Sequence, residues 1–197
     1  MEGAAAGATV AAAVADSAPP VQEATVKDIE TGKTVEGEGW FILNLDEATW
    51  DSNPDHGVWC AFEATDARFA QYGVNVHIVM PGQPNARYHS ESDQEGFLVL
   101  AGECVAVVEG RERRMRRWDY LHCPAGTKHI LIGAGDGPCA ILMTGARTEG
   151  QTSHYPVDPV AARHGASVAQ ATDSSREAYA DLTGTTSRVR SPWPLDG

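Results

Sequence analysis

The stretch that decides the fold runs from Pro81 to Gly102 and reads PGQPNARYHSESDQEGFLVLAG. His89 and Glu91 are two residues apart, so on a strand their side chains point to the same face. Glu95 keeps this even spacing and opens the apolar run 97–100. One face of a hairpin would therefore present an imidazole and two carboxylates to a common point.

A second stretch, PAGTKH at residues 124–129, supplies another nitrogen donor. Its proline and glycine predict a tight turn that releases a strand beginning at His129. Two imidazoles and one or two carboxylates converging inside a β-barrel are typical of a first-row transition-metal site with open coordination positions. We therefore predict one divalent transition metal (Fe, Mn, Zn or Ni), bound by His89, Glu91, Glu95 and His129.

Short apolar runs, rich in β-branched and aromatic residues, continue on both sides of these stretches. Glycine-containing turns separate the runs at regular intervals, which is the pattern of a sandwich, barrel or jelly roll. We predict an all-β fold, a jelly-roll barrel. The predicted strands cover residues 40–45, 57–62, 74–80, 97–100, 104–108, 120–123, 129–132 and 139–144.

The flanks of this region differ from it in composition and divide the chain into three parts. Residues 1–22 are alanine-rich and end in two prolines, which predicts a disordered tail or, alternatively, a short helix. Residues 23–147 form the predicted barrel. Residues 148–197 form a C-terminal extension with two short helices, over 159–164 and 174–182, and Gly165 stands where the first helix should end.

The two stretches resemble the paired motifs of the cupin superfamily, over roughly residues 70–146. The flanks resemble small, single-domain bacterial cupins with a type-2 conserved barrel, a group without an assigned function. The resemblance implies a double-stranded β-helix, a metal in the barrel and a homodimer. The first motif is matched by Gly82, His89, Glu91, Glu95 and Gly102, and the second by Pro124, Gly126 and His129.

The sequence departs from the family's pattern at three positions. Glu91 stands where the family has its second histidine, Gly133 replaces the final asparagine of the second motif, and Trp118 replaces its leading glycine. Only Glu91 touches the proposed metal. A shell of two histidines and two glutamates is harder and more anionic than one of three histidines and one glutamate, so it favours Fe, Mn, Zn or Ni over Cu(I).

Each proposed site residue also has a structural interpretation. His89, Glu95 and His129 could line a metal-free barrel, but two buried acids are most simply held ionised by a cation. Glu91 could swing to the rim as a proton carrier or face solvent. His77, on the predicted strand 74–80, could act as an acid–base group or be a hydrogen-bonded structural histidine.

Charge and cysteine content exclude several classes of function. With 15 Lys+Arg against 27 Asp+Glu, the net charge of −12 argues against nucleic acid or an anionic membrane as the partner. The basic run 111–117 is interpreted as a solvated hairpin or a subunit contact. The four cysteines form no CxxC pair. Because His122 and Cys123 are adjacent on a predicted strand, only one of them can face the barrel interior, and we expect it to be the cysteine. No signal peptide or membrane span is recognisable, so we expect a cytoplasmic protein.

Together these features predict a mononuclear metalloenzyme acting on an oxygen-bearing small molecule. The resemblance implies a dioxygenase, isomerase or lyase, hence an oxidoreductase or isomerase/lyase, with Glu91 or His77 moving protons. The alternative is a non-catalytic small-molecule or metal-binding sensor. The absence of a helix-turn-helix pattern or a basic face in the sequence counts against a DNA-bound regulator.

Overall fold

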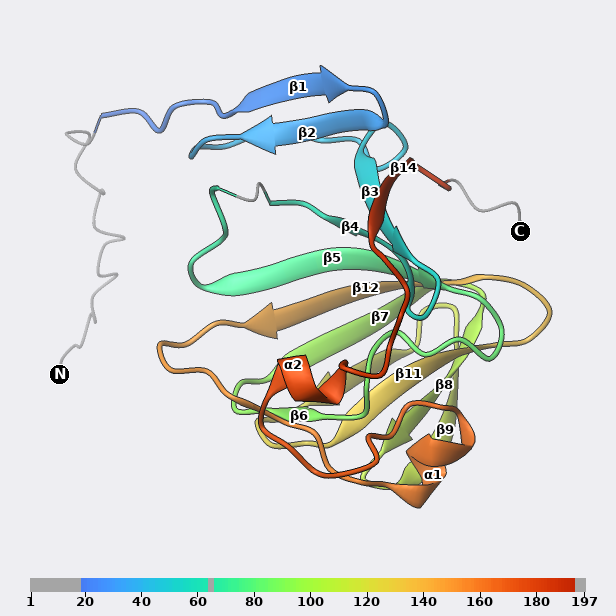
Figure 1. Ribbon diagram of the computed structural model, residues 1–197. Helices are drawn as coiled ribbons and strands as arrows, with labels where there is room; N and C mark the ends of the chain where they lie inside the picture. Colours follow the sequence, from blue (N-terminus) through green and yellow to red (C-terminus); the bar gives the residue numbers. More distant parts are fainter. Residues whose placement is uncertain (1–18, 64–65, 194–197) are drawn as a thin grey trace, which may run out of the picture.

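The computed structural model describes residues 19–63 and 66–193 (Figure 1). Most of the predicted N-terminal tail, residues 1–18, lies outside the described residues. Within the described part, no helix has the length and apolar character needed to cross a membrane.

Strands dominate the architecture, as the turn pattern predicts. The first half of the chain holds β1 (Thr25–Ile29), β2 (Gly32–Glu36), β3 (Thr49–Asn53), β4 (Gly57–Ala61), β5 (Tyr72–Val79), β6 (Ser90–Glu91) and β7 (Glu95–Ala101). The second half holds β8 (Glu103–Val108), β9 (Arg111–Arg116), β10 (Tyr120–Cys123), β11 (His129–Ala134), β12 (Cys139–Ala146), β13 (Ser153–His154), α1 (Pro159–Arg163), α2 (Ser175–Ala178) and β14 (Ser187–Arg190).

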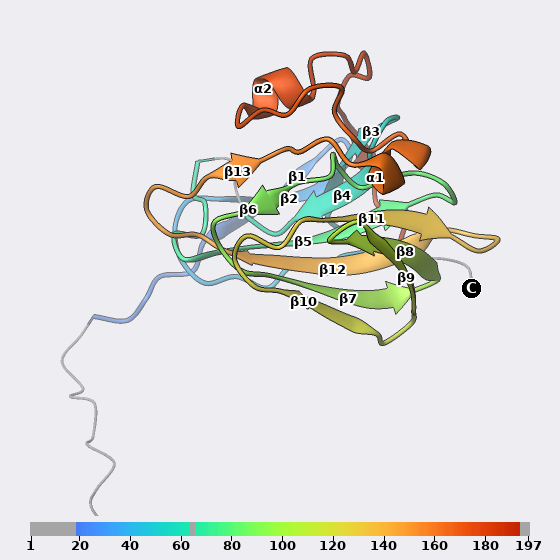
Figure 2. The same cartoon turned by 90° about the horizontal axis from the view of Figure 1, so that it is seen from below.

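Two antiparallel sheets enclose the main core. The larger has the order β10-β7-β12-β5-β4-β3-β14 and the smaller the order β11-β8-β9, and Figure 2 shows the smaller sheet lying over β12 and β7. Side chains from both sheets fill the space between them. This inner core consists of Val79, Phe97, Val99, Cys104, Ala106, Met115, Cys123, Leu131, Cys139, Ile141 and Met143. The arrangement is the double-stranded β-helix expected from the sequence.

Alternation along the strands separates an inner and an outer face of the larger sheet. On β5, Val79 belongs to the inner core, whereas Val76 and Ile78 pack on the outer face around Trp50. Trp193, near the end of the described chain, also packs on this outer face. The inner face is therefore the one on which odd-numbered β5 residues, including the predicted acid–base group His77, lie.

One predicted strand is wrong. Residues 40–45 obey the expected alternation, since Phe41 and Leu43 are half-buried while Ile42 is 85% exposed. Trp40 pairs with the backbone of Gln22 and Ala24, but the carbonyl of Asn44 accepts only turn bonds from Glu47 and Ala48, and residues 41–45 have no strand partner among the described residues. Side-chain alternation reports burial on one face, but a strand also needs an adjacent edge to pair with, which this segment lacks.

The C-terminal extension contains the two short helices that were predicted. Asp158 caps α1, and its carboxylate accepts hydrogen bonds from the first backbone N–H groups of the helix. Gly165 follows the end of α1 with φ +68°, a left-handed conformation that glycine adopts without strain. The extension then returns to the barrel, because β14 adds to the larger sheet beside β3.

Candidate metal centre

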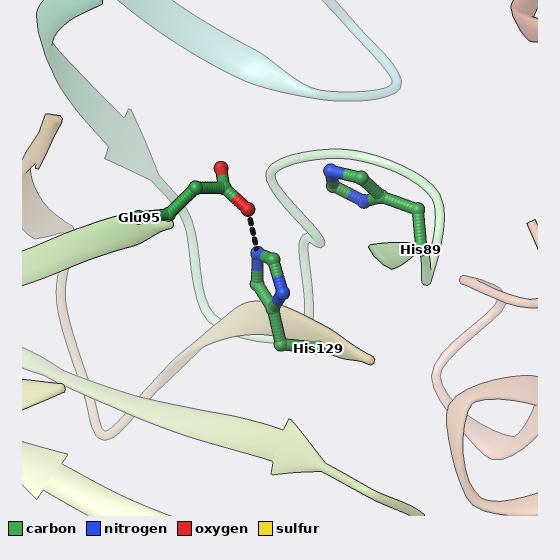
Figure 3. A group of neighbouring side chains, drawn as sticks. All are labelled: His89, Glu95 and His129. Carbon is green, nitrogen blue, oxygen red and sulfur yellow. Dashed lines mark ion pairs between the residues drawn. The ribbon is translucent and has the colours of Figure 1, made fainter. Parts of the chain in front are cut away.

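Three potential metal ligands, far apart in sequence, meet inside the barrel. His89 directly precedes β6, Glu95 is the first residue of β7, and His129 is the first residue of β11. One ligand atom from each lies within 4.8 Å of the other two. Figure 3 shows the two rings and the carboxyl group facing a shared space, with the Glu95 Oε2 to His129 Nε2 contact at 3.3 Å.

Backbone hydrogen bonds between the two motifs hold these donors together. The His89 N–H donates to the carbonyl of His129 at 3.2 Å, and the His129 N–H donates to the carbonyl of His89 at 2.8 Å. The N–H of Gly126, in the turn before His129, donates to the carbonyl of Glu91 at 2.7 Å. Gly126 has φ +80°, so the predicted tight turn does need a glycine there.

Both imidazoles are oriented with one nitrogen left for a metal. His89 Nδ1 lies 2.7 Å from the carbonyl of Arg87, and His129 Nδ1 lies 3.0 Å from the carbonyl of Thr127. A carbonyl only accepts, so each Nδ1 carries the proton and each Nε2 keeps its lone pair. Histidine ligands in metalloproteins are commonly fixed in this way. The donor set therefore fits a divalent transition metal.

The electrostatics of the three donors also fit a cation. The pKa of Glu95 is raised to about 8, mainly by burial and secondly by the negative charge of Glu91. Burial, and next the neighbouring His89, lowers the pKa of His129 to about 4, and burial lowers the pKa of His89. The 3.3 Å distance between Glu95 and His129 is that of an ion pair. However, the raised pKa of Glu95 and the lowered pKa of His129 leave both groups neutral at pH 7. A cation bound beside Glu95 would lower its pKa and so favour the ionised carboxylate.

Glu91, the fourth predicted ligand, does not join this three-residue cluster. Its Oε1 lies 3.8 Å from His89 Nε2. Its other oxygen, Oε2, accepts a short hydrogen bond from the side-chain amide of Gln151, in the C-terminal extension. Direct ligation by Glu91 stays a prediction, and its position beside the cluster is also that of a proton carrier.

The donors line a cavity of about 410 Å³. His77 lines the same cavity, but its Nε2 lies 2.6 Å from the carbonyl of His56, and burial lowers its pKa to about 4. This hydrogen bond favours the structural interpretation, while a catalytic role stays a prediction. The neighbouring Asn75 also lines the cavity, and its Oδ1 is buried without a hydrogen-bond partner among the described residues.

Some residues near the three donors were predictable from the sequence, and others were not. Cys123 is buried in the inner core and His122 is exposed, as the parity argument favours. Contacts from the C-terminal extension were missed: Tyr155 stacks on the His89 ring with centroids 5.6 Å apart, and Gln151 reaches Glu91. Neither residue lies in a motif, and nothing in their local sequence indicates that the extension folds back onto the site.

A comparison with protein families identifies the kind of barrel. Residues 75–145 match the model of the cupin domain. This region runs from β5 to β12 and includes all three clustered donors. Residues 75–145 thus form a cupin domain.

Solved structures with similar folds add no assignment of activity. A sugar phosphate isomerase of the cupin superfamily from Silicibacter pomeroyi is 30% identical over 43% of this chain and 56% of its own, with a TM-score of 0.41. A putative sugar phosphate isomerase from Acidithiobacillus ferrooxidans is 22% identical over 44% and 56%, with a TM-score of 0.42. The matched region thus spans little more than half of either isomerase.

A third similar structure covers more of its own length. It is an uncharacterized conserved protein with a double-stranded β-helix domain from Klebsiella pneumoniae, 18% identical over 56% of this chain and 93% of its own, with a TM-score of 0.46. No curated protein is detectably similar to this chain in sequence.

Proposed function

We propose that the protein is a mononuclear metalloenzyme that acts on an oxygen-bearing small molecule. The observation that carries this proposal is the convergence of one ligand atom each from His89, His129 and Glu95, with both histidine Nδ1 atoms engaged by backbone carbonyls. Two nitrogen donors and one oxygen donor suit Fe, Mn, Zn or Ni, and three protein ligands leave positions open for substrate.

The surrounding residues support binding and proton transfer. A metal held by these donors would polarise a substrate oxygen as a Lewis acid. Asn75 offers a buried acceptor in the cavity, which suits a hydroxyl-bearing substrate that donates a hydrogen bond to it. Glu91, beside His89 and held by Gln151, is placed to accept a proton from such a substrate. A metal, a hydrogen-bond acceptor and a proton carrier would suit a dioxygenase, an isomerase or a lyase.

Metal analysis tests the first half of the proposal. Protein purified without added metal should carry close to one transition-metal ion per chain by mass spectrometry. His129→Ala and Glu95→Gln should each lose most of it, while His122→Ala, which removes an exposed histidine outside the three-donor cluster, should keep it. Full occupancy in the His129→Ala variant would show that the ion binds elsewhere.

Turnover assays test the second half. The metal-loaded protein should be assayed for O₂ consumption and product formation with small phenols, keto acids and sugars, and water exchange at the metal should be recorded. Turnover with any of these that is lost in Glu95→Gln supports the enzyme. A coordinatively saturated metal that exchanges no water, together with no turnover, would instead favour a metal-binding or sensor protein.

A further inference from the structure

Arg87, two residues before His89, has a buried guanidinium whose partners all belong to the C-terminal extension. The residue is 5% exposed. Its Nε donates to the carbonyl of Ala178 at 3.2 Å, its Nη1 to that of Gly165 at 2.9 Å, and its Nη2 to Asp181 Oδ1 at 2.6 Å. A buried charge is stable only when it is paired in this way, so Arg87 holds the extension in one position.

The backbone of the same residue is bonded to the metal centre. The carbonyl of Arg87 accepts the hydrogen bond from His89 Nδ1 at 2.7 Å, and the N–H of Arg87 donates to the hydroxyl of Tyr179 at 3.1 Å. The ring of Tyr179 meets that of Tyr155 edge-on, and Tyr155 stacks on His89. Two of the contacts around the His89 ring therefore depend on the extension.

The extension also holds the chain on the other side of His89. Strand β13 pairs with β6, with Ser153 opposite Glu91 and His154 opposite Ser90, and Figure 2 shows the two strands side by side. The N–H of Ser92 donates to the carbonyl of Thr152 at 2.9 Å. His129 Nδ1 also bonds to the carbonyl two residues before it, but that residue, Thr127, has its N–H bonded to Pro124 in the same turn and not to the extension.

We propose that Arg87 is a positioning residue through which the C-terminal extension fixes the orientation of the His89 imidazole, and so sets the metal affinity of the site. This inference rests on the metal site proposed above. Losing an outer hydrogen-bond partner of a histidine ligand typically costs tenfold to a hundredfold in metal affinity. A lysine at position 87 keeps the charge but cannot replace the planar fork, which reaches four acceptors once the carbonyl of Ser167 at 3.4 Å is included.

The test uses the full chain and Co²⁺ as the probe. Arg87→Lys should weaken Co²⁺ binding about tenfold or more and change the visible spectrum of the bound ion. The ¹⁵N shifts of His89 in the metal-free variant should show a mixture of tautomers in place of one with the proton on Nδ1. Arg163→Lys is the matched control, since Arg163 also joins the extension to the barrel, at Glu112, but lies outside the contacts of His89. It should match the wild type.

A second variant keeps the inference testable if Arg87→Lys does not fold. Tyr179→Phe removes only the hydroxyl that accepts the Arg87 N–H, and it should weaken Co²⁺ binding in the same direction, by a smaller factor. A folded Arg87→Lys variant with wild-type affinity and a single His89 tautomer would overturn the inference. If Arg87→Lys fails to fold, unchanged affinity and tautomer in Tyr179→Phe would overturn it. A wild-type protein that binds no Co²⁺ would contradict the proposed function instead, while the His89 tautomer would still test the positioning.

Discussion

At the scale of single residues, the two carboxylates of the first motif differ in what surrounds them. Glu95 is in the three-donor cluster, whereas Glu91 lies beside it and is held by Gln151. The even spacing in the sequence predicts that both acids reach a common point, and both line the same cavity. Spacing does not say which oxygen atoms reach a common point, because that depends on side-chain torsions and on Gln151, which comes from the distant extension.

The first prediction separates the two acids. Glu91→Gln should keep its metal, with a Kd within about threefold of wild type, because the three clustered donors remain intact. Turnover should fall by roughly a hundredfold or more, the usual range for losing a proton acceptor. Metal titration and steady-state kinetics on the same preparation measure both. Loss of the metal in this variant would instead make Glu91 a fourth ligand.

A second prediction concerns the ion pair between Glu63 and Arg147, which joins the segment after β4 to the end of β12. The Glu63 side chain is only 7% exposed and receives Arg147 Nη1 at 2.8 Å and Phe69 N–H at 2.6 Å. Burial by itself would raise the pKa of Glu63, but the hydrogen bonds from Arg147 and Phe69 outweigh it, and the pKa lies below its ordinary value. The pair should therefore stabilise the fold above the unfolded pKa and stop doing so as the pH falls through the folded pKa.

Accordingly, Glu63→Gln should lower the free energy of unfolding by about 2 kcal/mol at pH 7. The difference from wild type should begin to shrink below the ordinary glutamate pKa of about 4.3, and it should approach zero only once the pH is below the lowered pKa of Glu63 in the folded protein. Urea unfolding at both pH values measures this. Glu103→Gln, in an exposed pair with Arg114, is the control and should change stability by less than about 1 kcal/mol. A loss that is equal at both pH values would mean that Glu63 acts through packing.

At the scale of elements, many strands of the barrel were predictable because each is a short apolar run between turns, and β11 is buried even on both faces. Strand β10 falls on the predicted residues 120–123, and β11 begins at His129 as predicted. The basic run, interpreted as a solvated hairpin or a subunit contact, forms β9, the largely exposed second strand of a hairpin with β8. It has no apolar alternation to mark it as a strand. Burial patterns predict strands that face a core, and they miss strands such as β9 whose side chains mostly face solvent.

The turn between β9 and β10 gives the third prediction. Trp118 has φ +76°, the left-handed conformation, at the position where the cupin motif has glycine. Its side chain is 62% exposed, so little packing compensates for this strain. Trp118→Gly should be about 1 kcal/mol more stable than Trp118→Ala, since the left-handed strain exceeds the entropy that glycine loses on folding.

Urea unfolding of the two variants measures that difference, and Tyr120 supplies the control. Tyr120 is equally exposed but lies in strand β10. There the order should reverse, with Tyr120→Ala more stable than Tyr120→Gly by roughly 0.5–1 kcal/mol. If the alanine variant is more stable than the glycine variant at position 118 as well as at position 120, the conformation of Trp118 carries no strain.

At the scale of the whole molecule, the metal centre joins parts that the sequence keeps apart. The motifs bring together His89 before β6, Glu95 at the start of β7 and His129 at the start of β11, which was predictable because their spacing relative to turns is local. The role of the extension was not predictable, because it depends on long-range contacts such as Arg87 with Ala178 and β14 with β3. Such contacts arise from the packing of the complete chain and leave no periodic signal.

The fourth prediction follows from this connectivity. A metal that binds only the folded protein should stabilise the whole fold, by about 2.7 kcal/mol when the free metal is at a hundred times its Kd. For a chain of this size the melting temperature should rise by roughly 5–10 °C. Differential scanning calorimetry with and without Zn²⁺ measures the shift, which should be absent in His129→Ala and intact in His122→Ala. The ion at the three-donor cluster would link β11 to β7 and to the segment before β6, and His129→Ala removes the donor on β11. An equal rise in melting temperature in that variant would therefore mean that Zn²⁺ stabilises the fold from another site.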